Sequence, residues 1–190
     1  VNNQLADTLA SDRFITAFVG ILDTALHRMR FHSGGQGPVI HFQAAPGACV
    51  RHKPTSFPLG AMRLSALRPV VTLEMQPGDI LLLLSDGIYE YEDSGGEQFG
   101  EARVEAIVRS HGGKSMAELS SILLDAVDAF AQGAPQADDI TVVLIKREPA
   151  TTGPHRAFKR SFDSLDEIFA FTSEVFASLQ MDPELLQTVG

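Results

Sequence analysis

The sequence predicts a mixed α/β (α+β) domain followed by the beginning of a second one, and three patterns support this. Residues 14–22 are rich in aromatic and β-branched side chains, as strands are. Residues 80–84 are all apolar, and this run has the length of a strand that is buried on both faces. Ser115 and Glu118 form a capping box before apolar residues at three- and four-residue spacing, which predicts an amphipathic helix.

Composition limits the class of protein. The 190 residues carry a net charge of −9 and are 44% hydrophobic, so the chain can bury a core. An acidic chain without a basic run is a poor match for nucleic acid. Its longest apolar runs are far shorter than the ~20 residues of a membrane span, and no signal peptide is visible. With Cys49 as its one cysteine, it cannot form an internal disulfide. We therefore expect a cytoplasmic protein with neither nucleic-acid nor membrane partners.

The remaining elements follow from local patterns. Residues 14–22 and the alternating residues 25–32 predict a hairpin, and residues 33–38, with three glycines and a proline, predict a loop. The further elements that we expect are a hairpin of residues 38–43 and 48–52, a strand at 69–75, a tight turn at 76–79, a helix at 101–110 and a strand at 140–145.

The composition of residues 148–154 predicts a linker, so we expect one domain over residues 1–147 and a truncated one over 155–190. A strand at 156–162 and a second capping box, Ser164 with Glu167, open this second domain. Because residues 1–6 resemble the middle of a helix and do not begin with Met, we expect the chain to be part of a longer protein.

Asp86 and Asp138 are the candidate site residues, because each lies beside a strongly apolar strand. A carboxylate in this position is costly unless its charge is compensated, and a metal ion can compensate it. If the two strands are neighbours, both carboxylates lie at the same edge of the sheet. Carboxylate oxygens suit Mg²⁺ or Mn²⁺ better than Zn²⁺. The alternative is that both residues serve only in turns.

Motifs along residues 1–147 resemble those of the metal-dependent (PPM) serine/threonine phosphatases, in their SpoIIE/RsbU-like branch. The matching stretches are the Phe-x-Thr segment at 14–18, the loop at 33–38, Pro-Leu-Gly at 58–60, the strand with Ser-Asp-Gly at 78–90, Phe99-Gly100 and Asp-Asp-Ile-Thr at 138–141.

The resemblance implies an α-β-β-α sandwich, in which two antiparallel sheets are flanked by helices and two Mn²⁺ or Mg²⁺ ions lie between them. Asp86 and Asp138 match the metal ligands, and a metal-bound water is the nucleophile, without a further catalytic side chain. Asp139 would hydrogen-bond near the site, with a ligand role in place of Asp138 as the alternative. Thr16 would pack or hydrogen-bond behind the ligands.

Two departures from the family pattern limit this expectation. Gly35 stands where the family commonly has His. The amino-terminal family segments that supply the other metal carboxylates have no counterpart in the chain. We therefore expect the chain alone to hold half of a site, to bind Mn²⁺ poorly and to be inactive.

A second resemblance involves residues 157–167 and 181–186, which are similar to the start of the GHKL-type ATPase domain of anti-sigma-factor kinases. The alternative is an unrelated α/β extension. The nucleotide-binding box of that family would follow Gly190, so no ATP-site residue is assigned.

The expected function is dephosphorylation of an anti-sigma-factor antagonist in a bacterial sigma-factor partner-switching pathway. An anti-sigma or sigma factor is a further possible partner. The alternatives are a non-catalytic PPM-like module that binds a protein in the same signalling system, and a piece that forms a homodimer through uncovered apolar surface.

Overall fold

The computed structural model describes residues 1–149, except 11 and 67, and residue 170. Val1–Pro149 form one compact unit. The elements in chain order are α1 (Asn2–Thr8), β1 (Ala17–Asp23), β2 (Arg28–Gly34), β3 (Val39–Gln43), β4 (Ala48–His52), β5 (Val71–Glu74), β6 (Ile80–Leu84), α2 (Asp86–Tyr89), α3 (Gly100–His111), α4 (Met116–Ala131) and β7 (Val142–Lys146). Apart from residue 170, the strand, the capped segment and the kinase-like domain predicted beyond residue 154 lie outside the described residues.

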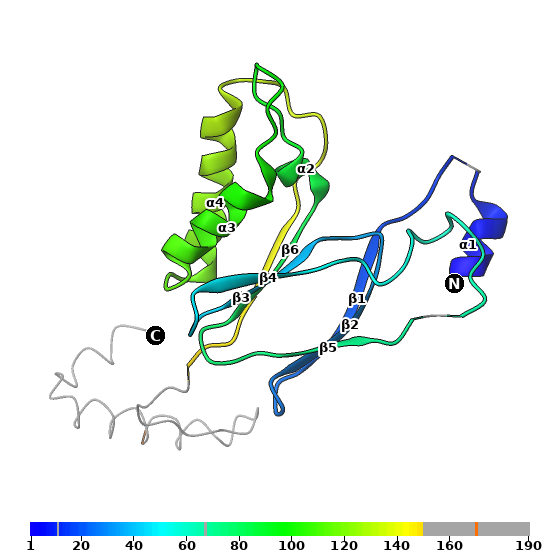
Figure 1. The fold of residues 1–190 in the computed structure, drawn as a ribbon, viewed down its shortest axis with the longest axis horizontal. Coiled ribbons are helices and arrows are strands. Elements are labelled where there is room, and N and C mark those ends of the chain that lie inside the picture. The colour runs from blue at the N-terminus through cyan, green and yellow to red at the C-terminus, as the bar shows by residue number, and fades with distance from the viewer. Residues whose placement is uncertain (11, 67, 150–169, 171–190) are drawn as a thin grey trace, which may run out of the picture. The chain divides into compact units, whose positions relative to one another are not determined.

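The described residues form two antiparallel sheets, as expected (Figure 1). One sheet has the strand order β1-β2-β5 and the other has the order β4-β3-β6-β7. Both predicted hairpins are confirmed: β1 pairs with β2 from Ala17 opposite Gly34, and β3 pairs with β4 from Val39 opposite His52. The mixed α+β fold class is therefore confirmed.

Several predicted strand boundaries differ from the structure, and the differences at residues 33–34 and 14–16 have clear physical reasons. We expected Ser33 and Gly34 in a loop, but both belong to β2. The buried Ser33 donates its backbone N–H to Thr55 Oγ1 at 2.9 Å and accepts from Thr55 N at 2.9 Å, so a segment distant in sequence satisfies its backbone. Residues 14–16 were expected within the first strand, but β1 begins at Ala17, and Ile15 instead forms an isolated bridge with Leu59.

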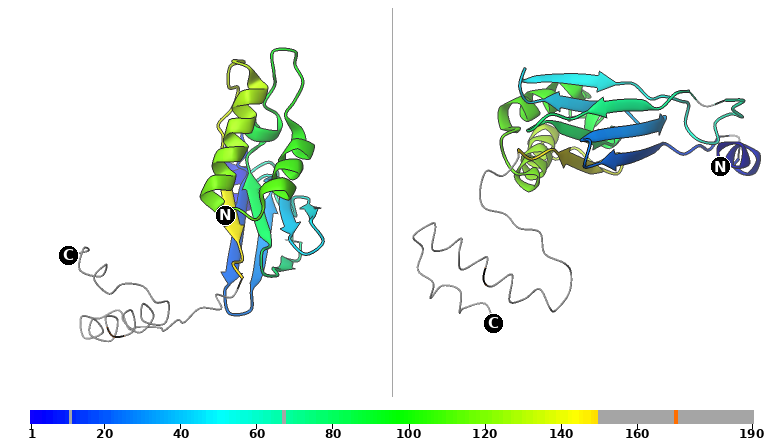
Figure 2. Two further views of the ribbon diagram at one scale, coloured as in Figure 1. Left: turned by 90° about the vertical axis from the view of Figure 1, so that its left-hand side faces the viewer. Right: turned by 90° about the horizontal axis from the view of Figure 1, so that it is seen from below.

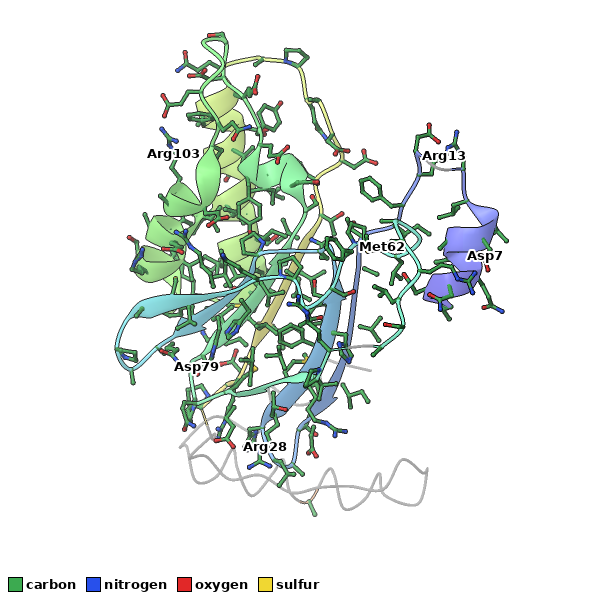
Figure 3. The ribbon with its side chains drawn as sticks, turned by 45° about the vertical axis from the view of Figure 1, so that its right-hand side comes forward. Asp7, Arg13, Arg28, Met62, Asp79 and Arg103 are labelled. Carbon is green, nitrogen blue, oxygen red and sulfur yellow. The ribbon has the colours of Figure 1, made fainter. Side chains whose placement is uncertain are left out.

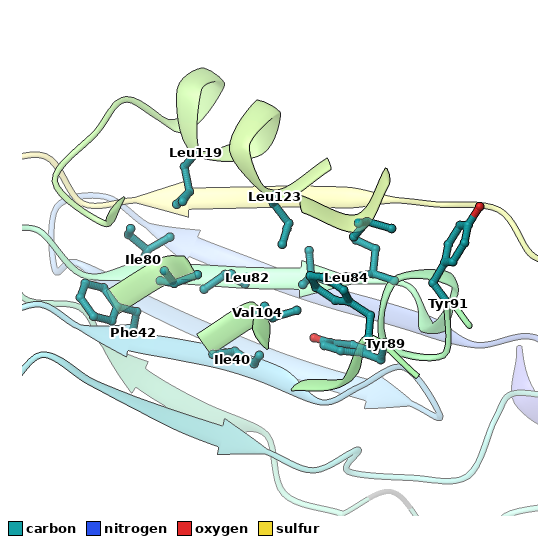
Figure 4. Close-up of a cluster of buried hydrophobic side chains, with 14 of the residues drawn as sticks. Ile40, Phe42, Ile80, Leu82, Leu84, Tyr89, Tyr91, Val104, Leu119 and Leu123 are labelled. Carbon is teal, nitrogen blue, oxygen red and sulfur yellow. The ribbon is translucent and has the colours of Figure 1, made fainter. Parts of the chain in front are cut away.

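β6 lies inside the four-stranded sheet, hydrogen-bonded to β3 on one side and β7 on the other. Helices α3 and α4 cover one face of this sheet, contacting β4 and β7 (Figure 2). Figure 4 shows Leu119 and Leu123 of α4 pointing toward β6, which carries Ile80, Leu82 and Leu84. On the opposite face of β6, Leu81 is buried in the second core cluster, with residues of the three-stranded sheet. Burial on both faces explains the continuous apolar run of β6.

The predicted capping box at the start of α4 is confirmed. Ser115 Oγ accepts the backbone N–H of Glu118 at 3.3 Å, and Glu118 Oε2 accepts the backbone N–H of Ser115 at 3.1 Å. These two bonds satisfy donors that the first turn of a helix leaves free.

Helix α1 lies beyond the end of the three-stranded sheet and buries none of its residues (Figure 1). The side chains of Asn2 and Asn3 bond to the backbone of Met62 and Leu64 at 3.0 Å each. Within residues 1–149, no helix covers the outer face of the three-stranded sheet (Figure 2). One of the two helical layers of the expected α-β-β-α arrangement is thus present in the part of the chain that is described.

A buried pair of side chains, His41 and Asp79, lies on the inter-sheet side of the four-stranded sheet. His41 Nε2 of β3 lies 3.0 Å from Asp79 Oδ2, which also accepts Gln76 N at 2.8 Å. Asp79 Oδ1 accepts Ala44 N at 2.9 Å. Figure 3 shows Asp79 among the strands, whereas Arg28 lies at the periphery. Burial of a carboxylate here is tolerated because its oxygens are hydrogen-bonded.

Within the described residues, no helix has the length and apolar character needed to cross a bilayer.

Candidate metal centre

The two candidate ligands stand where neighbouring strands meet. β6 and β7 are antiparallel, with Leu84 opposite Val142, so the end of β6 adjoins the start of β7. The ladder continues by one further bond, from Ser85 N to Thr141 O at 3.1 Å. We expected Asp86 and Asp138 to lie at the same edge only if their strands are neighbours in one sheet. β6 and β7 are neighbours, so this condition is met.

Asp86 is the first residue of the short helix α2. Ser85 before it is extended, so the chain passes directly from the buried strand into a helical turn. The Asp86 side chain is exposed, and Oδ1 accepts the backbone N–H of Gly87 at 3.1 Å. The Asp-Gly pair thus begins a helix and not a β-turn. The second carboxylate oxygen of Asp86, Oδ2, forms no hydrogen bond with the described residues.

Asp138 lies in a bend of the segment between α4 and β7 and is also exposed. Its Oδ1 accepts the backbone N–H of Asp139 at 2.7 Å, and Gln136 Nε2 donates to its carbonyl oxygen at 2.8 Å. Both bonds are local, so they shape the bend without neutralising the carboxylate.

Asp86 and Asp138 line the same cavity, whose volume is about 400 Å³. Its wall is acidic, because Glu90, Glu92 and Asp93 also line it. The other lining residues are Gly87, Tyr91, Gln98, Ala134, Pro135 and Ala137. The structure therefore places the two predicted ligands in one negatively charged hollow at the edge of the sheet.

The donor set fits a hard divalent cation in kind but is small in number. Within the described residues, neither Asp86 nor Asp138 forms an ion pair with Lys, Arg or His. Charged carboxylate oxygens without a cationic partner suit Mg²⁺ or Mn²⁺. No group of three or more His, Cys, Asp or Glu side chains in the described residues is arranged to hold an ion. Further ligands would have to come from water or another segment.

Asp139 borders this site, whereas nothing places Thr16 in it. Asp139 is exposed and lines a smaller hollow together with Asp138, Gln136 and Ala137. Thr16 is exposed, precedes β1 and is not among the residues that line either hollow. Of the predicted site residues, the structure therefore brings Asp86 and Asp138 together in the larger cavity.

The loop before β3 contacts the site through a residue that the sequence patterns did not indicate. Gln36 Nε2 donates to Leu84 O at 2.8 Å, two residues before Asp86. Gly35 has φ +71°, and a Cβ there would lie 2.5 Å from Pro58 Cγ. A His at this position would therefore be strained and would require Pro58 to move.

Tyr89, in the same helical turn as Asp86, is a buried phenol whose hydroxyl donates to Pro38 O at 3.4 Å. Burial raises the pKa of Tyr89 well above its usual range, and the nearby Glu101 carboxylate raises it further. Tyr89 therefore stays neutral and anchors α2 to the loop before β3.

Residues 1–148 match the family described as Stage II sporulation protein E (SpoIIE). Among curated proteins, the chain is 27% identical over 135 residues to Protein IcfG of Synechocystis, a match that covers 70% of this chain and 21% of that protein. The chain thus spans about a fifth of the length of this relative.

Three solved structures have a similar fold. The SiaA-PP2C domain of Pseudomonas aeruginosa has a TM-score of 0.66 at 16% identity, with 76% of this chain and 57% of that one covered. The RsbU and RsbW domains of a Mycobacterium tuberculosis protein give 0.58 at 22% identity, with 88% and 46% covered. The phosphatase domain of SpoIIE from Bacillus subtilis, presoaked with Mn, gives 0.57 at 18% identity, with 83% and 65% covered. The chain belongs to the SpoIIE family and has the fold of its PP2C-type phosphatase domains.

Proposed function

We propose that the protein containing this chain is a metal-dependent protein serine/threonine phosphatase of the SpoIIE/RsbU-like branch. The observation that carries the proposal is the convergence of Asp86 and Asp138, from neighbouring strands, on one acidic cavity. Family membership over residues 1–148 supports the same reaction class.

Asp86 and Asp138 would hold Mn²⁺ or Mg²⁺, in a centre of two ions whose other ligands lie on segments outside this chain. Bound divalent cations supply Lewis acidity, which activates water and polarises a phosphoryl group. Both carboxylates are exposed, so a phosphoserine on the surface of another protein can reach them. We assign Asp139 a hydrogen-bonding role beside the site, with a ligand role as the alternative, and Thr16 a packing role.

The proposed substrate is a phosphorylated anti-sigma-factor antagonist, and the proposed setting is a cytoplasmic partner-switching pathway. Similarity to a structure that contains RsbU and RsbW domains supports this setting. We also propose that residues 155–190 begin a GHKL-type kinase-like domain after a linker at 148–154. A phosphatase and a kinase-like domain on one chain would set the phosphorylation state of one antagonist in opposite directions.

The test uses the full-length parent protein with a phosphoserine-bearing antagonist and Mn²⁺. Asp86→Asn and Asp138→Asn should each lower phosphate release by about a hundredfold, because each removes a charged metal ligand. Asp128→Asn, on the exposed surface of α4, is the matched control and should leave the rate unchanged. Full activity in both site variants would refute the assignment.

The chain alone should bind Mn²⁺ weakly and should not hydrolyse para-nitrophenyl phosphate, because its described residues hold no group of three or more ligands. Hydrolysis by the chain alone that is lost in Asp86→Asn would contradict this expectation.

A second candidate function is a non-catalytic PPM-like module that binds a protein of the same signalling system. Two observations favour it: the small ligand set of the described residues and the Gly at position 35. The parent sequence before Val1 distinguishes the two functions. Carboxylates in the family's amino-terminal motifs support the enzyme, and their replacement by other residues supports the binding module.

A homodimer is a third possibility, supported by exposed apolar residues on the edge strand β1, where Val19 is 69% and Ile21 is 62% accessible. Sedimentation at high concentration should then reveal a dimer, and a monomer throughout would refute it.

A further inference from the structure

Ser85 connects the two segments that carry the candidate ligands. Its hydroxyl donates to Asp139 O at 2.9 Å and accepts the backbone N–H of Thr141 at 2.9 Å. Ser85 lies between the last residue of β6 and Asp86, whereas Asp139 and Thr141 lie just after Asp138. One side chain therefore fastens the segment before β7 to the end of β6 by two hydrogen bonds.

Gly87 permits a close approach on the other side of Asp86. A Cβ at this position would lie 2.5 Å from Asp139 O and 3.3 Å from Asp138 O. Real Cβ atoms do not come as close to a backbone oxygen as the first of these distances, so any other residue at 87 would push the Asp139–Ile140 peptide away. Ser85 and Gly87 thus act on the same peptide beside Asp86. Ser85 forms a hydrogen bond with its carbonyl oxygen, and Gly87 lacks the Cβ that would displace it.

Few other polar contacts hold this segment. Within the described residues, its other hydrogen bonds to distant parts of the chain run from Ser85 N to Thr141 O at 3.1 Å and from Tyr91 Oη to Ala134 O at 3.0 Å. The bond from Gln136 to Asp138 O is local. A segment with exposed, irregular backbone and few anchors opens easily, so the loss of one anchor should release it.

We propose that Ser85 is a positioning residue for the metal centre, and this inference rests on the proposed function. Its hydroxyl is engaged both as donor and as acceptor with the backbone, so it serves to orient the segment. By holding the Asp138 segment beside Asp86, Ser85 sets the separation of the two carboxylates and hence their joint affinity for a divalent cation. The role resembles that of residues that orient metal ligands without touching the metal.

The experiment uses NMR on the 190-residue chain titrated with Mn²⁺, whose paramagnetism broadens nearby amides even when binding is weak. In the unmodified chain, amides of residues 86–87 and 138–139 should broaden together over the same Mn²⁺ range. In Ser85→Ala, the Mn²⁺ concentration for half-broadening at 138–139 should rise about tenfold, and the Thr141 amide should exchange about tenfold faster.

Ser85→Thr keeps the hydroxyl and should restore both readouts. Gly87→Ala leaves Ser85 intact but displaces the same peptide, so it should also weaken the joint Mn²⁺ response. Ser121→Ala, an exposed serine on α4, is the matched control and should change neither readout.

The outcomes separate the two proposals. Equal broadening of both segments in Ser85→Ala and in the unmodified chain would overturn the role of Ser85 and leave the metal site standing. No broadening at either segment in the unmodified chain would show that Asp86 and Asp138 do not bind a cation jointly within this chain, and it would overturn the positioning role. Broadening at 86–87 alone in Ser85→Ala, restored in Ser85→Thr, supports the inference.

Discussion

The two sheets differ in what covers them. The four-stranded sheet has α3 and α4 on one face and the other sheet on its opposite face, whereas the three-stranded sheet is covered on one face within the described residues. In β6, every residue but Leu83 is buried, while in β1 the stretch from Val19 to Leu22 is exposed. We therefore expect burial, more than strand pairing, to decide how much each strand contributes to stability.

The same difference locates the candidate site. Asp86 follows the buried strand β6 after one residue, Ser85, so its backbone is held by the packed core, whereas Asp138 lies on an exposed segment. One ligand is therefore fixed by packing, and the other depends on the few hydrogen bonds that bind its segment to that core.

The largest effect should come from truncating β6. Leu82 is fully buried in the core between the sheet and the helices, so Leu82→Ala should lower the free energy of unfolding by about 3–4 kcal/mol. Ile21→Ala on the exposed face of β1 should cost less than about 0.5 kcal/mol. Urea unfolding of the two variants measures both values, and equal losses would refute the contrast between the sheets.

Asp79→Asn tests the inter-sheet layer and should have the next largest effect. Asp79 is 2% exposed and holds His41, Gln76 N and Ala44 N, so the change leaves buried donors without a charged acceptor. We expect a loss of about 3 kcal/mol in urea unfolding. The control is Asp125→Asn on the exposed surface of α4. A loss no greater than that of the control would show that the pair adds nothing to stability.

The acid dependence of stability should show a smaller effect, at His52. Burial lowers the pKa of His52, and the neighbouring His41 lowers it further. As the pH falls below about 6.5, the unfolded chain binds a proton that folded His52 resists, so the free energy of unfolding decreases.

His52→Gln removes this titration. Between about pH 7.5 and about pH 5.5, the urea midpoint of the variant should fall less than that of the parent. Identical falls would show that another group causes the acid sensitivity.

The smallest effect should come from the surface of the three-stranded sheet. Arg28 Nη2 lies 2.8 Å from Glu74 Oε1, but the side chains are 46% and 62% exposed. Glu74→Gln should therefore change the free energy of unfolding by less than about 0.5 kcal/mol, and less still in high salt. A loss above about 1 kcal/mol would mean that this face contributes more than its exposure suggests.

Much of the fold could be predicted from local patterns. The hairpins, β6 and the capped helix α4 each have a signal that spans a few neighbouring residues, and all are confirmed. The errors fell at strand ends. Ser33 and Gly34 extend β2 because they pair with Phe18 and Ala17 of β1. The distant Thr55 also bonds to the backbone of Ser33, and no local pattern reports such a partner.

The candidate site was partly predictable for the same reason. Asp86 and Asp138 stand out because a charge beside an apolar strand is unusual in the sequence itself. The roles of three other residues depend on contacts with parts of the chain that are distant in sequence. Ser85 bonds to residues 139 and 141, and Gly87 lies against residues 138–139. Gln36 bonds to Leu84. The motif Ser-Asp-Gly contained two of these residues, but it did not show what they contact.

By itself, the sequence determined which segments become strands and helices and which carboxylates stand beside apolar strands, because these properties depend on neighbouring residues. The tertiary structure alone decided that β6 adjoins β7, that Ser85 bonds the segment beyond Asp138, and that no helix of the described residues covers the outer face of the three-stranded sheet. Each of these depends on contacts between residues distant in the chain, whose free energy exists only once the sheets have packed together.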